Sequence, residues 1–112
     1  MTNIRWMKWA IARHFRQQGL KIRLVPIPLG NAIIDGEVIG DGWKMALELK
    51  TPNDDIVRGL GQIIEALAYG YDKTALVTTF RKAKRIDLTV FDKFSLTLLG
   101  IDSKAKVHEI HS

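Results

Sequence analysis

Three side chains that could do chemistry together lie on either side of one candidate turn. Asp35 precedes an Asp41-Gly42 pair, Glu48 and Lys50 follow it, and strand-forming residues flank the pair. Asp-Gly in this setting predicts a hairpin with a type I′ turn. With these two as the turn residues, Asp35 faces Glu48 across the hairpin, and Lys50 lies on the same face as Glu48. Two carboxylates and an amine in one place are typical of a divalent-metal site.

The apolar residues of the same segment support this register. They occupy the opposite face, which we expect to be buried: Ile34, Val38, Met45, Leu47 and Leu49. A shift of one residue would bury the charged side chains and expose the apolar ones instead. Alternating charged and apolar residues also describe an ordinary strand with one solvated face. The facing of Asp35 and Glu48 favours a site, because like charges directly opposite repel each other and a purely structural pair of strands avoids them.

The hairpin contains two further acids, Glu37 and Asp41, which we do not expect to be primary metal ligands. Glu37 lies on the face of Asp35, one pleat nearer the turn, where it could help to hold a second metal or be solvated. We favour solvation. Asp41 is interpreted as a turn residue.

Hydrophobic periodicity and turn residues predict the elements that hold the hairpin in place. An amphipathic helix is expected over residues 3–18, with Gly19 as its stop. Strands are expected over residues 21–28, 74–80, 95–101 and 107–110. A helix is expected from residue 51, where a capping residue and acids begin it, to about residue 69, and a more weakly patterned one over residues 81–94. Without repeats or linkers, residues 1–112 form a single domain.

The expected helix after Lys50 leaves directly from the strand that carries the candidate site. One of its faces is polar and carries, at helical spacing, Arg58, Gln62, Glu65 and Tyr69. Gly59 and Gly61 also lie within this helix, where each costs about 1 kcal/mol relative to alanine. They indicate a close approach of the helix backbone to DNA or to a second subunit.

The order Asp35, then Glu48-Leu49-Lys50 on the next strand, resembles the hallmark of the PD-(D/E)XK nuclease superfamily. The resemblance extends over nearly the whole chain and implies an α/β, restriction-endonuclease-like core. In such a core a mixed central β-sheet is flanked by helices, in the order α-β-β-β-α-β-α-β. Two departures stand in the sequence: Ile34 takes the place of the proline, and residues 1–34 hold no acid, although archaeal Holliday-junction resolvases carry one on the first helix.

The resemblance also implies roles for individual residues. Asp35, Glu48 and the backbone carbonyl of Leu49 would form an all-oxygen site for Mg²⁺ or Mn²⁺. Lys50 would orient a water molecule or stabilise negative charge on the phosphate. Gln62 resembles the Gln that RecB-like nucleases have near the active site, although Ala66 stands where their Tyr would follow. An exposed helix residue is the alternative interpretation of Gln62.

Composition restricts the class of protein. The chain has 112 residues and no cysteine, which excludes a disulfide scaffold and a thiolate metal site. It shows no long apolar run and no signal peptide, so we expect a soluble, cytoplasmic protein without a membrane segment. Residues 31–72 hold eight acids, and the flanking segments are basic, giving a net charge of +5. This distribution suits a metal site beside surfaces for a polyanion.

These observations lead to DNA as the expected partner. The residues expected to bind nucleic acid are Arg5, Lys8, Arg13, Arg58, Arg81, Lys82, Lys84 and Arg85. The resulting hypothesis is a metal-dependent deoxyribonuclease, with endonuclease action favoured, in repair, recombination or mobile-element or viral replication. The resemblance implies a homodimer. Two alternatives stay open: a non-catalytic DNA-binding module on the same fold, and an α/β domain unrelated to nucleic acid whose Glu-x-Lys is coincidental.

Overall fold

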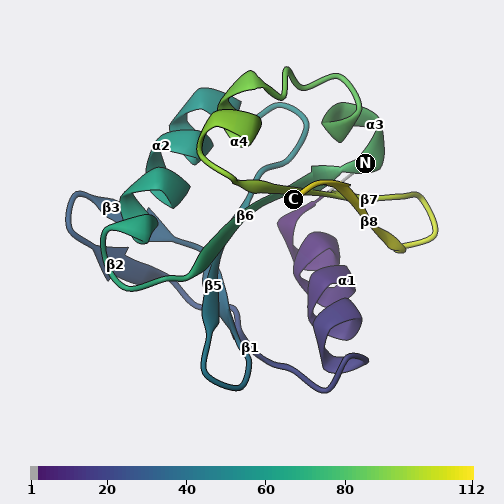
Figure 1. The fold of residues 1–112 in the computed structure, drawn as a ribbon. Coiled ribbons are helices and arrows are strands. Elements are labelled where there is room, and N and C mark those ends of the chain that lie inside the picture. Colours follow the sequence, from purple (N-terminus) through teal and green to yellow (C-terminus); the bar gives the residue numbers. More distant parts are fainter. Residues whose placement is uncertain (1–2) are drawn as a thin grey trace.

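The structure is a computed structural model that describes residues 3–112, and it has the mixed α/β architecture that the sequence predicts (Figure 1). Its elements, in chain order, are α1 (Ile4–Arg16), β1 (Lys21–Arg23), β2 (Ile27–Leu29), β3 (Ala32–Ile34), β4 (Gly36–Ile39), β5 (Lys44–Leu49), α2 (Ile56–Leu67), β6 (Lys73–Thr79), α3 (Phe80–Ala83), α4 (Thr89–Lys93), β7 (Thr97–Ile101) and β8 (Val107–His111). No helix among residues 3–112 is long and apolar enough to cross a bilayer.

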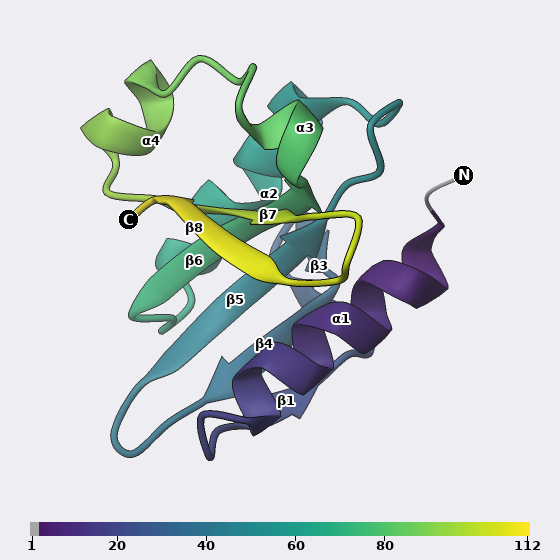
Figure 2. The same cartoon turned by 90° about the vertical axis from the view of Figure 1, so that its right-hand side faces the viewer.

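Six strands form one sheet in the order β1-β4-β5-β6-β7-β8, and β2 and β3 form a separate hairpin. The central strands β5, β6 and β7 are parallel, whereas the outer pairs are antiparallel. A parallel connection needs a crossover, which α2 supplies between β5 and β6. The carboxyl ends of β5 and β6 therefore meet at one edge of the sheet (Figure 2).

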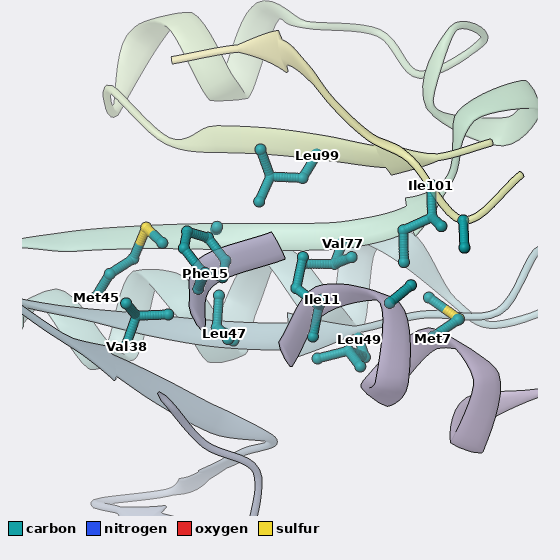
Figure 3. Packing of buried hydrophobic residues seen from close by; sticks show 13 residues of the cluster. Met7, Ile11, Phe15, Val38, Met45, Leu47, Leu49, Val77, Leu99 and Ile101 are labelled. Atoms are coloured by element: carbon teal, nitrogen blue, oxygen red, sulfur yellow. The ribbon is translucent and has the colours of Figure 1, made fainter. Parts of the chain in front are cut away.

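Helix α1 covers one face of the sheet. Its apolar stripe places Met7, Ile11 and Phe15 in a core built with Val38, Met45, Leu47, Leu49, Val77, Leu99 and Ile101 (Figure 3). Ile4, the first residue of the stripe, stays 37% exposed. The backbone leaves the helix through Gly19 at a φ of +77°, a conformation that glycine adopts without a steric penalty.

Helices α2, α3 and α4 cover the other face. They share a second core that consists of Ile63, Leu76, Ala83, Phe91, Leu96 and Leu98. Helix α2 begins later than expected, because Asp55 is its cap and accepts hydrogen bonds from the N–H groups of Val57 and Arg58. Thr51 instead closes a turn with Asp54, donating to that carboxylate from its N–H at 2.7 Å and from its hydroxyl at 2.9 Å.

Three sequence-based expectations are corrected. Residues 81–94 form no single helix but the short helices α3 and α4, and residues 21–28 are divided into β1 and β2. The register that follows from Asp41 and Gly42 as the turn residues is confirmed, since Ile39 pairs with Lys44 and Glu37 with Ala46. The turn between them is not of type I′, because Gly42 has a φ of +78° whereas Asp41 is not among the positive-φ residues of the described chain.

The fourth correction concerns the strand that carries Asp35. Asp35 forms a bend between β3 and β4 and donates its N–H to the carbonyl of Leu47 at 3.0 Å. The side-chain alternation changes there, so Ile34 packs with Ala46, Ala66 and Tyr71 on the α2 side instead of with the α1 core. The ladder pairs Gly36 with Leu47 and then stops, so Asp35 does not pair with Glu48 as a ladder residue.

Candidate active site

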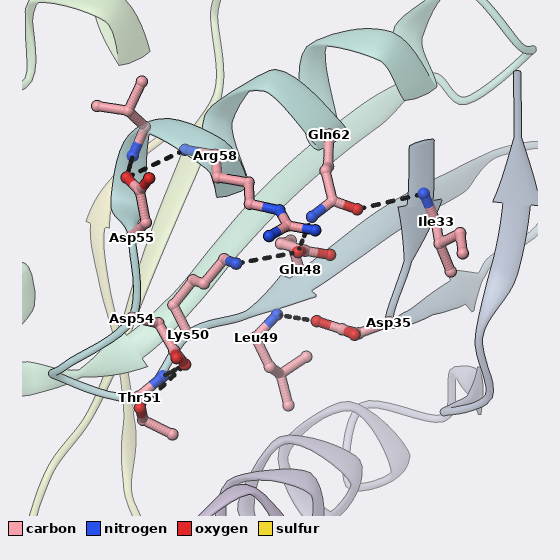
Figure 4. Close-up of polar contacts among 11 residues, drawn as sticks. Ile33, Asp35, Glu48, Leu49, Lys50, Thr51, Asp54, Asp55, Arg58 and Gln62 are labelled. Carbon is pink, nitrogen blue, oxygen red and sulfur yellow. Dashed lines mark hydrogen bonds and ion pairs between the residues drawn. The ribbon is translucent and has the colours of Figure 1, made fainter. Parts of the chain in front are cut away.

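Glu48 is the centre of the polar cluster at the carboxyl end of β5 (Figure 4). Only 3% of the residue is exposed, because α2 packs over this face of the sheet. Its Oε2 accepts a hydrogen bond from Gln62 Nε2 at 2.8 Å and lies 3.6 Å from the ammonium of Lys50. Its Oε1 is buried and has no hydrogen-bond partner among the described residues. A buried carboxylate oxygen without a partner is costly and is a candidate ligand for a cation.

Asp35 reaches the same place from the bend between β3 and β4. Its Oδ2 accepts the N–H of Leu49 at 2.7 Å, a bond that a strand partner would otherwise make. The N–H and C=O of one strand residue point to the same side, so the Leu49 carbonyl also faces the side of Asp35. Asp35 and the Leu49 carbonyl thus lie on the same side of β5, and the carboxyl group of Glu48 is close enough to Asp35 to interact with its charge.

The electrostatics of Glu48 follow from this placement. Burial first, and the neighbouring charge of Asp35 second, raise the pKa of Glu48 to about 8 from an ordinary value of 4.5. The ammonium of Lys50 acts in the opposite direction without offsetting them. Near neutral pH, Glu48 is thus held protonated unless additional positive charge arrives, which a divalent cation would supply.

Gln62 joins the carboxylate to the small hairpin. Its amide nitrogen donates to Glu48, and its amide oxygen accepts the N–H of Ile33 in β3 at 3.2 Å. Both ends of the amide are therefore engaged, in contrast to the alternative of a freely exposed helix residue. The contact with Ile33 could not be found from sequence, because it depends on how the β2–β3 hairpin packs beside α2.

Lys50 runs beneath α2 where that helix carries Gly59. A Cβ at Gly59 would lie 2.8 Å from Cε and 3.3 Å from Cγ of Lys50, and 3.0 Å from Leu76 Cδ1. The close approach at Gly59 is therefore to a lysine of the same chain, not to DNA or to a second subunit. Gly61 is exposed, and a Cβ added there would meet nothing within 4 Å, so no contact within residues 3–112 explains this glycine.

The eight basic residues expected to bind nucleic acid do not form one surface. Arg58 lines a shallow hollow with Gln62 and extends from α2 on the side of the candidate site (Figure 4). Arg81, Lys82, Lys84 and Arg85 line a separate cavity. Arg5, Lys8 and Arg13 lie on α1, on the opposite face of the sheet from α2. Arg13 also has a structural contact, since it donates to the Ala105 carbonyl at 2.9 Å and stacks on Trp9.

The interpretation of Glu37 as a solvated residue is wrong. Glu37 is only 7% exposed, and its two oxygens are both bonded. The hydroxyl of Tyr71 donates to Oε1 at 2.7 Å, and Arg23 Nε pairs with Oε2 at 3.1 Å. With these partners it forms a structural ion pair and leaves no free oxygen to suggest a second metal. Among residues 3–112, no three His, Cys, Asp or Glu side chains are grouped to hold a metal ion.

Three solved structures share this fold. An XisH family protein from Nostoc punctiforme matches with a TM-score of 0.70 and 14% identity, over 96% of this chain and 99% of its own. A protein of unknown function from Silicibacter pomeroyi, SPO1766, matches with a TM-score of 0.68 and 14% identity, over 99% and 71%. An fdxN element excision controlling factor protein from Anabaena variabilis matches with a TM-score of 0.67 and 14% identity, over 95% and 98%.

At this identity the likeness shows the fold alone, and that fold is consistent with the restriction-endonuclease-like core. No protein-family model matches the chain. No curated protein matches it either.

The metal-free protein should lose stability as the pH rises. The unfolded chain releases the Glu48 proton near pH 4.5, whereas the folded chain retains it up to about pH 8. The free energy of unfolding should therefore fall between these two values. Urea unfolding in EDTA at pH 5 and at pH 8 checks this, with Glu48→Gln as the matched control that removes the fall. An equal fall in the variant would contradict the assignment.

Asp35→Asn should not destabilise the metal-free protein. The amide oxygen can still accept the N–H of Leu49, and the repulsion between Asp35 and Glu48 disappears. Asp35→Ala should cost about 1–3 kcal/mol, because that N–H loses its acceptor. Urea unfolding in EDTA compares the two. Equal destabilisation of both variants would show that the charge of Asp35, rather than its hydrogen bond, supports the fold.

Proposed function

We propose that the chain is a metal-dependent nuclease that hydrolyses DNA phosphodiester bonds, with endonuclease action favoured. The observation that carries the proposal is the buried Glu48 carboxylate, whose Oε1 has no partner among residues 3–112 and whose neighbour is a second carboxylate. A purely structural domain gains nothing from this arrangement, because the two acids oppose each other's ionisation.

The donor set fits Mg²⁺ or Mn²⁺. Asp35, Glu48 and the Leu49 carbonyl are all oxygen ligands, and Mg²⁺ typically takes only one or two carboxylates and keeps several waters. The two carboxylates and the carbonyl would leave the other positions to water and to phosphate oxygens. When bound, the cation would polarise a scissile phosphate and stabilise its negative charge.

The remaining residues of the cluster would orient the Glu48 carboxylate and the attacking water, and would neutralise negative charge on the phosphate. Gln62 holds Oε2 of Glu48, and Oε1, which is buried without a partner among the described residues, would be the atom that binds the cation. The ammonium of Lys50 lies 3.6 Å from Oε2 and would stabilise charge on the phosphate or orient the attacking water. Arg58, on the same side of α2, would contact a neighbouring phosphate without reading base sequence.

DNA is proposed as the substrate on two grounds. The chain is basic, with a net charge of +5, and basic side chains near a metal site attract a polyanion such as DNA. Two of the proteins that share the fold are described as an XisH family protein and an fdxN element excision controlling factor protein. This supports a role in DNA excision or recombination. A homodimer, which would set two sites against two strands, stays a prediction.

One observation favours a non-catalytic DNA-binding module on the same fold. Within residues 3–112, the site has two acids and no third His, Cys, Asp or Glu ligand. Metal binding separates the two candidates without any need for turnover. In the nuclease, Mg²⁺ or Mn²⁺ should raise the unfolding temperature of the wild type but not that of Asp35→Asn or Glu48→Gln. The binding module should show no such difference.

Cleavage tests the proposal directly. Labelled duplex, single strand, flap and four-way junction DNA are incubated with wild type and Lys50→Ala, in Mg²⁺, Mn²⁺ or EDTA. Cleavage should require the metal and fall by about 10²–10³-fold in the variant, the usual effect of losing one group that stabilises developing charge. Absence of cleavage on every substrate, with DNA binding retained, would refute the proposed nuclease activity and support the binding module.

Gly59→Ala should impair cleavage through Lys50 without impairing the fold. The added methyl group would displace the lysine side chain, and a displacement on the scale of 1 Å can reduce a rate by roughly 10²-fold. Affinity for DNA in EDTA should not change. Gly61→Ala is the matched control: it meets nothing within 4 Å, so it should keep full activity and gain up to about 1 kcal/mol of stability. Equal activity of both variants would refute this account of Gly59.

A further inference from the structure

A second feature shares the sheet edge with the candidate site. A cavity of about 730 Å³ opens between the start of α1, the loop after β5, α3 and the β7–β8 turn. Its lining includes Pro52, two residues beyond Lys50, and Thr79, at the carboxyl end of β6. Because β5 and β6 are parallel neighbours, the cavity and the candidate site lie at the same ends of these strands.

The charge of this cavity is strongly one-sided. Four of its lining residues are basic: Arg81, Lys82, Lys84 and Arg85. The acid in the lining, Asp102, is already engaged, since Oδ2 lies 2.7 Å from His108 Nε2 and Oδ1 accepts the N–H groups of Lys104 and Lys106. A second cavity, of about 710 Å³, has Lys73 balanced by Glu109. Of these two cavities, the one beside the candidate site is therefore suited to an anion.

The same cavity has an aromatic wall. Trp6 and Phe80 both line it. The Phe80 ring is already occupied by neighbours, because the tilted ring of His108 packs against it at a centroid distance of 4.5 Å and Lys84 Nζ lies 4.7 Å from its centroid. Trp6 is half-buried and makes no such ring contact with the described residues. Trp6 packs against the α1 core on one side and lines the cavity on the other, so it is the aromatic side chain that a flat ligand in the cavity could contact.

We infer that this cavity binds an unpaired nucleotide, its base against Trp6 and its phosphates on Arg81 and Arg85. The volume lies within the range of about 300–1,000 Å³ typical of sites for small organic groups. Bases within a duplex are stacked and cannot enter such a cavity, whereas an unpaired base can stack on an aromatic side chain beside a basic groove. The inference rests on the proposed function and narrows its substrate to DNA with a single-stranded end, flap or gap.

The test is a binding measurement in EDTA, where cleavage does not occur. A blunt duplex, the same duplex with an unpaired tail, the tail alone, the duplex with an RNA tail, and a free mononucleotide are titrated. Wild type should bind the tailed duplex at least tenfold more tightly than the blunt one. Trp6→Leu should lose about tenfold on tailed DNA only, in the range measured for one stacked base. Trp6→Phe should keep the preference.

Matched controls come from α1 and its surroundings. Trp9 is 54% exposed on the same helix but does not line the cavity, so Trp9→Leu should leave the preference for tailed DNA unchanged.

Arg81→Ala with Arg85→Ala tests the basic side of the cavity. This pair should reduce affinity for tailed DNA and lower the slope of log K against log salt by about one to two. Arg16→Ala with Lys21→Ala removes the same charge at the far end of α1, about 15 Å along its axis from Trp6. That pair should leave the tail preference unchanged.

Equal affinity of wild type for blunt and tailed DNA would overturn the inference. So would equal effects of Trp6→Leu and Trp9→Leu, or equal losses on both DNAs in Arg81→Ala with Arg85→Ala. Tight binding of the free mononucleotide with no tail preference would assign the cavity to a small ligand instead. A tail preference without cleavage would refute only the nuclease, and cleavage without a tail preference would refute only this inference.

Discussion

A carboxylate placed beneath a helix costs free energy unless it is paired, and the arrangement around β5 is organised by the one at Glu48. Gln62 and Lys50 both approach its Oε2, and Gly59 leaves the room that the lysine needs. These partners do not complete the pairing, because Oε1 stays buried without one among the described residues and the pKa of the group is raised to about 8. The fold thus maintains a carboxyl group whose ionisation is unfavourable and would be favoured by a bound cation, as functional sites often do.

The bend at Asp35 is the second constraint, and it acts on both sides of the strand. By giving its carboxylate to the N–H of Leu49, Asp35 replaces a backbone partner with a charged side chain. The same bend moves Ile34 to the α2 side and starts the separate β2–β3 hairpin. That hairpin then contacts α2 through Gln62, so the ligand geometry and the local fold are set by the same few hydrogen bonds.

The charged residues at this edge of the sheet form two groups, one suited to binding a cation and the other to binding an anion. Acids gather where α2 covers β5, whereas the cavity beside α3 is lined by four bases and one engaged acid. Gly100 permits this second arrangement, since a Cβ there would lie 2.8 Å from the backbone of Phe80 and would push α3 away from the sheet. A nucleic acid strand that crosses this edge would meet a cation site on one side and an anion-binding cavity on the other.

The hairpin register over residues 36–39 and 44–47 and the stripe of α1 were determined by sequence, because each depends on residues close together in the chain. Asp35 instead comes near Glu48 through a bend that the sequence did not predict. Alternation over a few residues decides which side chains share a strand face, and the spacing of Met7, Ile11 and Phe15 decides which side of a helix is buried. The burial of Glu37 against Tyr71, the bond from Gln62 to Ile33 and the packing of Lys50 under Gly59 were decided only by tertiary structure. These contacts join segments up to 34 residues apart, and no local pattern carries information about which distant side chain will arrive.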